Sequence, residues 1–246
     1  MSPQIPSEGY YLQFPSFLRF SHLKHVLTTR EYPFNFFEGS DQKKFLEYFG
    51  MPDSRLVIPR QIHGSDIAVI DDSFSDESHE TFTADAVLSL KKGIWIGILV
   101  ADCAPLLYYD PAQPIVAVVH VGWGGLIQDI HLKVLSCLTQ RFSSCANDIW
   151  VGIGPAIGPC CFQVGEEVAR QFQNRRAASL YLIQKNHYQY TIDLRGFIFS
   201  ELIELGILSE HIDLIPYCTS CRTDLFYSYR REGKSTGRIL LAAALK

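Results

Sequence analysis

Short apolar runs separated by polar turns dominate the middle of the chain and predict a strand-rich protein. Hydrophobic and β-branched residues mark strands at 55–59, 67–70, 86–90, 94–100, 106–109, 115–119, 149–153, 212–215, 225–229 and 238–243. The run 115–119 is almost purely apolar, as is typical of a strand buried on both faces. The acidic, serine-rich stretch 71–83 predicts an exposed loop between two strands.

Helical periodicity lies between these strands in three places. From Leu126 to Leu138 apolar residues recur at spacings of three and four, which predicts one helix with an apolar face. Segments 165–172 and 194–205 are also predicted helices, and Gly206 is the type of residue that ends the second. Hairpins combined with long crossovers predict an α/β fold with mixed sheets, and we assign all 246 residues to one domain.

Composition narrows the classes of function. A chain of 246 residues with 47% hydrophobic residues can bury a sizeable core. A net charge of −4 and a pI near 6.1 predict no surface for nucleic acid, and no apolar run approaches the length of a membrane helix. The first residues lack the pattern of a signal peptide, so we expect a cytoplasmic monomer with reduced cysteines that acts on small molecules.

Three motifs each place a potential metal ligand beside an apolar segment. His63 lies in the turn Gln61-Ile62-His63-Gly64, Cys103 follows the strand 94–100, and His120 follows the strand 115–119. Two imidazoles and one thiolate match a catalytic zinc site that keeps an open position. Taken singly, each has a simpler interpretation: a surface histidine, a buried or nucleophilic cysteine, and a core histidine. Asp102 is a candidate for supporting the ligands or for acid–base chemistry.

Other polar residues leave alternatives open. The glycine-rich helix start at 122–125 suits an anion such as phosphate, although close packing also demands glycine. Arg230, Arg231 and Arg238 are candidates to clamp phosphate, or are solvated residues of a strand. Adjacent Cys160-Cys161 and the pair Cys218 and Cys221 do not complete a metal site by their spacing. We therefore interpret both pairs as packing or loop residues.

These motifs together resemble the YfiH/YlmD-like proteins, long called laccase-domain or multicopper polyphenol oxidases. The family is now described as zinc-dependent purine nucleoside phosphorylases that also deaminate adenosine. Six motifs occur in family order: Gln61-Ile62-His63-Gly64, Thr83-Ala84-Asp85-Ala86-Val87, Ala101-Asp102-Cys103-Ala104-Pro105, Val119-His120-Val121-Gly122-Trp123, Gly152-Ile153-Gly154-Pro155-Ala156-Ile157-Gly158 with Cys160-Cys161, and Ser228-Tyr229-Arg230-Arg231 with Thr236-Gly237-Arg238. The resemblance implies a layered α/β sandwich related to bacterial necrotizing deamidase toxins.

The resemblance also implies a chemistry. His63, Cys103 and His120 would hold one zinc ion per chain, with Cys103, Asp102 and His120 as the catalytic residues. Arg30, Gln61, Arg230 and Arg238 would bind the substrates, which are phosphate and adenosine, inosine, guanosine or methylthioadenosine.

Two positions depart from the family pattern. Gly124 stands where the family usually has arginine. The segment after Arg30 keeps Asn35 but lacks the usual glycine pair and serine.

Three other functions compete with this interpretation. In a metal-free cysteine hydrolase that edits cell-wall precursors, Cys103 would be the nucleophile and His120 the base. A non-catalytic relative would keep zinc for stability alone, and Gly124 is the feature that favours it. A copper polyphenol oxidase fits poorly, because the chain has eight scattered histidines and two methionines.

Overall fold

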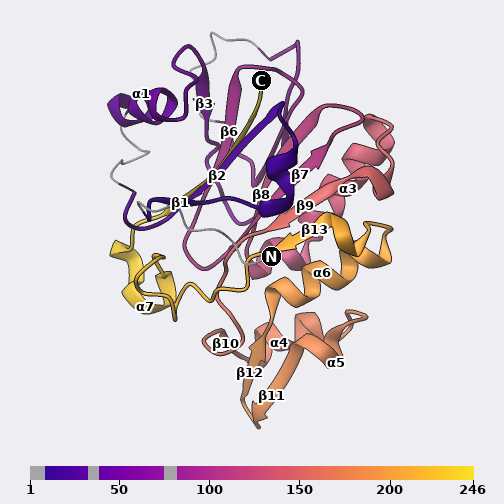
Figure 1. Cartoon of the computed structure of the whole chain (residues 1–246). Helices are drawn as coiled ribbons and strands as arrows, with labels where there is room; N and C mark the ends of the chain where they lie inside the picture. Colours follow the sequence, from indigo (N-terminus) through magenta and orange to yellow (C-terminus); the bar gives the residue numbers. More distant parts are fainter. Residues whose placement is uncertain (1–8, 33–38, 75–81) are drawn as a thin grey trace.

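The structure is a computed structural model that describes residues 9–32, 39–74 and 82–246. Its strands form three sheets (Figure 1). The five-stranded sheet has the order β1 (Tyr11–Leu12), β2 (Leu23–Thr28), β14 (Ile239–Leu245), β6 (Ile94–Val100) and β3 (Arg55–Val57). The six-stranded sheet has the order β13 (Ile212–Leu214), β9 (Trp150–Ile153), β7 (Ala104–Asp110), β8 (Ile115–Val121), β5 (Ala86–Ser89) and β4 (Ile67–Ile70).

Both large sheets are mixed. The pairs β3–β6, β4–β5 and β9–β13 are parallel, whereas the other pairs of these two sheets are antiparallel. The third sheet, in the order β10 (Gln163–Gly165), β12 (Gln189–Ile192) and β11 (Leu182–Asn186), is antiparallel. It lies at one end of the molecule with α4 (Glu166–Phe172) and α5 (Ala178–Tyr181), as Figure 1 shows.

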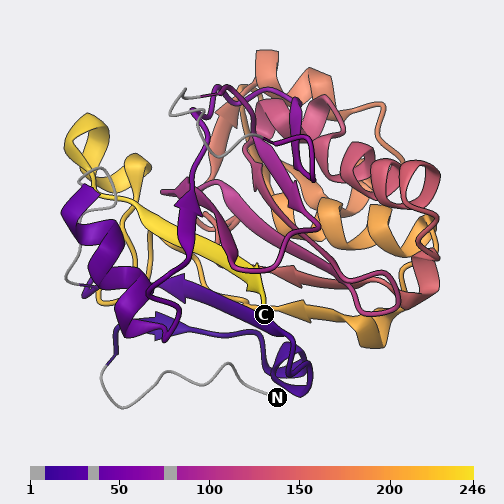
Figure 2. The ribbon, with the colours of Figure 1, turned by 90° about the horizontal axis from the view of Figure 1, so that it is seen from above.

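The two large sheets pack face to face and are covered by helices on their outer sides (Figure 2). Successive residues of a strand point to opposite faces, so Val116 and Val118 of β8 enter the core between the sheets. Their neighbours Ala117 and Val119 pack in the core that contains α3 (Ile130–Arg141) and α6 (Leu194–Glu204). On the other side, Phe45 of α1 (Gly39–Tyr48) packs in a third cluster with residues of β6 and β14. The result is a four-layer sandwich in which β8 is buried throughout.

Most of the predicted elements are confirmed, with strand boundaries within two residues of those expected. The predicted helix over Leu126–Leu138 is instead α2 (Trp123–Ile127) followed by α3, because Asp129 between them has a left-handed backbone with φ 60°. Gly206, with φ 94°, follows α6 as expected. Residues 71–74 form part of the predicted loop, whereas 75–81 lie outside the described residues.

The predicted strand at 225–229 is wrong. The N–H groups of Leu225 and Phe226 both donate to the Arg222 carbonyl, which makes this segment a turn. The Ser228 side chain then accepts from the Arg231 N–H and caps the short helix α7 (Tyr229–Glu232). The apolar pattern reflects burial of Leu225 and Phe226 against the sheets rather than strand pairing. The sequence interpretation also missed β2 and the three-stranded sheet.

We predict that His25 in β2 makes the fold sensitive to acid. Its ring is 3% exposed and accepts a 2.9 Å hydrogen bond from the Phe14 N–H, and burial lowers the pKa of His25 to about 3. As the pH falls, His25 gains its proton in the unfolded chain before it does so in the folded chain. The free energy of unfolding therefore decreases as the pH drops from about 6.5 toward 3. This one group should cost about 2 kcal/mol at pH 5.

Urea unfolding between pH 7 and pH 5 tests this against His25→Gln, which keeps an acceptor for the Phe14 N–H but has no proton to gain. The variant should lose less stability than the natural chain over this range. An identical pH slope in the two proteins would assign the acid sensitivity to other groups.

Candidate active site

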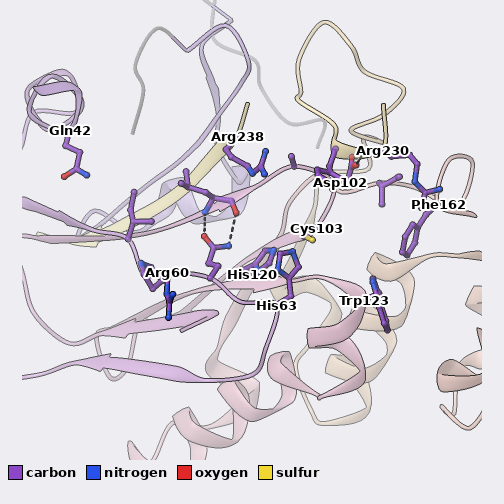
Figure 3. Close-up of a pocket in the computed structure, with 17 residues that line it drawn as sticks. Gln42, Arg60, His63, Asp102, Cys103, His120, Trp123, Phe162, Arg230 and Arg238 are labelled. Atoms are coloured by element: carbon purple, nitrogen blue, oxygen red, sulfur yellow. Dashed lines mark hydrogen bonds between the residues drawn. The ribbon is translucent and has the colours of Figure 1, made fainter. Parts of the chain in front are cut away.

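The fold brings His63, Cys103 and His120 together (Figure 3). One ligand atom from each lies within 4.8 Å of the others, although the residues come from three separate segments. His120 belongs to β8 and shares the strand face that carries Val118, Cys103 lies in the turn between β6 and β7, and His63 follows β3. The cluster has the donor set of a three-ligand metal site with an open position.

Asp85, just before β5, holds two of these three segments in place. Its carboxylate has no solvent exposure and accepts hydrogen bonds from the backbone N–H groups of Ile62, His63 and Gly64, at 3.2, 3.0 and 2.7 Å. The same carboxylate lies 2.8 Å from Nδ1 of His120. That contact leaves the other imidazole nitrogen of His120 for a metal ion or for Cys103. Burial alone would raise the pKa of Asp85, but these donors lower it below its usual value.

The backbone around the cluster is crowded and strained. A Cβ atom at Gly122 would lie 3.0 Å from Cys103 Sγ and 3.3 Å from His63 Cδ2, so glycine permits the close approach of β8 to both ligands. His63 and Asp102 have positive φ values of 59° and 87°, in the left-handed region that side chains other than glycine rarely adopt. Such strain persists where surrounding contacts enforce it, and is concentrated at functional sites.

The cysteine and the buried histidine change each other's ionisation. Burial raises the pKa of the Cys103 thiol, but the charge and hydrogen bond of His120, with a contribution from His63, lower it to about 6. Burial lowers the pKa of His120, but Cys103 and Asp85 raise it to about 9. Near neutral pH the metal-free pair is therefore a thiolate beside an imidazolium. A thiolate is the form that binds metal or attacks an electrophile.

Asp102 links the cysteine turn to the C-terminal part of the chain. Its carboxylate accepts hydrogen bonds from the hydroxyls of Thr219 and Ser228, at 2.6 and 3.0 Å, and from the Arg230 N–H at 2.7 Å. Its carbonyl accepts from the Ile157 N–H at 2.9 Å. The side chain is 8% exposed, and both of its oxygens are occupied by these partners. Asp102 thus fixes the segment that presents Cys103.

The cluster opens into a cavity of about 950 Å³. Three arginines, Arg60, Arg230 and Arg238, line it, and within the described part of the chain none of them forms an ion pair with a carboxylate. Their hydrogen bonds go to the Thr83 hydroxyl and to backbone carbonyls. Trp123, which is 40% exposed, and Phe162 also line the cavity, and Phe162 lies next to Arg230 in Figure 3. The cavity thus combines unpaired positive charge with aromatic surface.

Two of the predicted substrate-binding residues have other partners. Gln61 lines the cavity, but its amide donates to the Leu99 carbonyl and accepts from the Leu99 N–H, at 2.9 and 2.8 Å, which ties the His63 turn to β6 (dashed lines in Figure 3). Arg30 is not among the cavity-lining residues. Its guanidinium contacts the Thr223 carbonyl and Glu232. Asn35 lies outside the described residues.

The sequence interpretation gave no role to Asp85, Arg60, Trp123 or Phe162. Asp85 and Trp123 lie within two of the family motifs, and Arg60 directly precedes Gln61-Ile62-His63-Gly64. Their position within or next to a motif is the sequence feature that could have identified them. Phe162 follows Cys160-Cys161 but belongs to a loop whose direction only the fold defines.

The remaining cysteine pairs lie in loops, as one of the two interpretations expected, but the two pairs are not separate. Cys160, Cys161, Cys218 and Cys221 form one cluster, with all four sulfurs within 4.8 Å of one another. Spacing along the chain did not reveal it, because the two pairs come from loops about sixty residues apart.

Comparison with known proteins gives the family. The chain belongs to the family described as multi-copper polyphenol oxidoreductase laccase, whose model matches residues 39–246. A purine nucleoside phosphorylase of Clostridium acetobutylicum is 33% identical over 91% of this chain and 93% of the relative. The adenosine deaminase RL5, from an unknown prokaryote, is 33% identical over 74% of this chain and 72% of its own length.

Solved structures share the fold. The crystal structure of YlmD from Geobacillus stearothermophilus has a TM-score of 0.84 and 27% identity, with 96% of each chain covered. That of a hypothetical protein YfiH from Bacillus licheniformis has a TM-score of 0.87 and 24% identity, with 99% of each chain covered. The resemblance to YfiH/YlmD-like proteins and the mixed α/β fold are thereby confirmed, whereas the link to deamidase toxins stays a prediction. Among the described residues, none of the helices has the length and apolar character needed to span a membrane.

We predict that Asp85→Asn destabilises the fold even without metal. The amide keeps one acceptor oxygen but turns an NH₂ group toward buried donors. The free energy of unfolding, measured in urea with a chelator present, should therefore fall by about 3 kcal/mol. Asp71→Asn, a change at a partly exposed carboxylate paired with Arg141, is the control and should shift stability by no more than about 0.5 kcal/mol. Equal effects of the two changes would contradict the role given to Asp85.

Proposed function

We propose that this protein is a zinc-dependent purine nucleoside phosphorylase with a second, adenosine-deaminating activity. The observation that carries the proposal is one cavity in which the His63, Cys103 and His120 cluster faces three arginines that have no carboxylate partner among the described residues. The names of the relatives supply the purine class. Adenosine, inosine, guanosine and methylthioadenosine are the proposed nucleosides.

The residues present fit a zinc ion. A mixed imidazole and thiolate set suits zinc. The Asp85 carboxylate contacts Nδ1 of His120, as carboxylates commonly contact the second ring nitrogen of a metal-bound histidine. Gly122 leaves room for the ligand side chains to converge. When bound, zinc would supply Lewis acidity and the activation of water near neutral pH. His63, Cys103 and His120 would be its ligands.

The arginines and aromatic residues account for binding of the two substrates. In phosphorolysis a phosphate oxygen attacks the anomeric carbon of the ribose while the bond from that carbon to the purine nitrogen breaks, and the electron pair leaves with the purine. Arg60, Arg230 and Arg238 would hold phosphate and neutralise its charge. Trp123 and Phe162 offer faces on which a purine can stack. The proposed role of Asp102 is to position Cys103 and Arg230 through its hydrogen bonds.

One alternative is favoured by a specific observation. The Cys103 thiolate beside the His120 imidazolium is the arrangement of a cysteine nucleophile with its base. A metal-free hydrolase acting on cell-wall precursors would use the same two residues. A copper oxidase is less well supported. Among the described residues, a single cluster of candidate metal ligands contains histidine, and it contains two histidines, too few for several copper ions.

Turnover of adenosine by the zinc-loaded protein, with and without phosphate, is the direct test. We expect adenine that requires phosphate, and inosine without it, and Cys103→Ala should lose both products together with the metal of this site. The separated products are measured by chromatography. Activity that survives chelation but is destroyed by thiol alkylation would instead establish the cysteine hydrolase, and full activity in Cys103→Ala would exclude both assignments.

We predict that Gly124→Arg strengthens phosphate binding. Gly124 lies in the first turn of α2, and a Cβ atom there would lie 3.4 Å from the His63 carbonyl, in ordinary van der Waals contact. A charge-assisted hydrogen bond from the arginine that the family usually carries should lower the KM for phosphate about tenfold.

Gly165→Arg is the matched control, since that glycine has no neighbouring atom within 4 Å of an added Cβ and is not among the residues that line the cavity. Its KM for phosphate should not change. The same KM in both variants would show that position 124 does not contact phosphate.

A further inference from the structure

A second cluster of metal-ligating side chains lies outside the proposed active site. Cys160 and Cys161 belong to the loop after β9, and Cys218 and Cys221 to the loop after β13. Their four sulfurs all lie within 4.8 Å of one another. The Sγ of Cys221 is 3.6 Å from that of Cys160 and 3.4 Å from that of Cys161.

These separations match a tetrahedral metal site better than disulfides. With zinc–sulfur bonds of about 2.3 Å, the edges of a tetrahedron of sulfurs are about 3.8 Å long. A disulfide would bring two sulfurs to about 2.05 Å. All four cysteines are free thiols in the structure, and Cys221 has two sulfur neighbours at similar distances. The cluster therefore has the size and shape of a four-thiolate cage.

The backbone explains how two adjacent cysteines contribute to one cage. The N–H groups of Cys161 and Phe162 both donate to the Gly158 carbonyl, at 2.9 and 2.8 Å, so the chain turns tightly at this point. The second loop is held alongside by a parallel bridge between Ala156 and Cys218 and by the Thr219 N–H, which donates to the Ala156 carbonyl at 3.2 Å. Backbone pairing thus places the two loops before any metal binds.

The surroundings suit the charge of a metal with four thiolates, which would be −2 with a divalent ion. The Gly158 N–H donates to Cys218 Sγ at 3.2 Å. Arg195 is 8% exposed and interacts electrostatically with Cys218 and Cys160, and its guanidinium is fixed by the carbonyls of Ile215 and Tyr217, at 3.0 and 2.9 Å. Such N–H donors and a fixed cation are the outer partners that thiolate ligands require.

We propose that Cys160, Cys161, Cys218 and Cys221 bind a second, structural zinc ion. Zinc sites with four cysteine ligands are closed, so this ion would have no open position for substrate. Its role is to join the second loop to the first, which forms part of the cavity wall. The first loop carries Ile157 and Phe162, both of which line the cavity.

Three residues, Arg230, Arg231 and Thr219, connect the joined loops to the rest of the proposed active site. The Arg230 guanidinium donates to the carbonyls of Cys161 and Gln163, at 3.3 and 3.0 Å. Arg231 donates to the carbonyls of Thr219 and Ser220, at 3.0 and 2.8 Å. The Thr219 hydroxyl bonds Asp102, which precedes Cys103. The second zinc ion would thus hold Phe162 and Arg230 in place without contacting the substrate.

Metal content of the purified chain tests the proposal and does not depend on any catalytic activity. We expect two zinc ions per chain, one for each cluster. The double change Cys160→Ser with Cys221→Ser should remove one ion, and His63→Ala should remove the other. Cys145→Ser, at an exposed cysteine outside both clusters, is the control and should keep two.

Spectroscopy of the cobalt-loaded protein provides a second test that does not require the serine variants to fold. Cys103→Ala loaded with Co²⁺ should still show strong thiolate-to-cobalt charge transfer and the d–d bands of a tetrahedral site. Absence of those bands would overturn the proposal. So would zinc content that is unchanged by Cys160→Ser with Cys221→Ser, or a protein mass lowered by the hydrogens lost to disulfides within this cluster. Failure of the nucleoside assay with two zinc ions bound would count against the proposed activity alone.

Discussion

The buried carboxylate of Asp85 is the interaction on which the proposed active site depends. It accepts three backbone N–H groups from the turn that carries His63 and contacts the ring of His120 in a different strand. A buried carboxylate requires several partners, and here every partner belongs to the site. One side chain therefore sets the position of one histidine through its backbone and of the other through its ring.

A second carboxylate repeats this arrangement on the opposite side of Cys103. Asp102 is held by two hydroxyls and a backbone N–H from segments more than one hundred residues later in the chain. Its left-handed backbone, like that of His63, shows that these contacts impose a conformation that the local sequence disfavours. The cysteine is thus presented by a turn that the C-terminal segments stabilise, and the ligand cluster exists only in the folded chain.

Different parts of the fold carry the proposed metal ligands and the residues proposed to bind the substrate. His120 lies in β8, and His63 and Cys103 lie in turns beside strands. The arginines and aromatic residues that would select the substrate lie in loops or in the short helices α2 and α7. Gly124, the departure from the family pattern, lies in the first turn of α2 rather than in the ligand cluster. In the proposed second site, a zinc ion bound by four cysteines would add rigidity to two loops that also pack against the core through Ile157, Phe162 and Phe226.

The sequence by itself indicated most of the strands and helices and the three candidate ligands of the first cluster. Apolar residues that recur every two positions, or every three to four positions, mark the buried face of a strand or a helix. The motifs in family order pointed to His63, Cys103 and His120. The same logic failed at 225–229, where a buried apolar segment is a turn. Tertiary structure alone decided the role of Asp85, the other partners of Gln61 and Arg30, and the joining of two distant cysteine pairs. These depend on contacts between residues far apart in the chain, which no local pattern records.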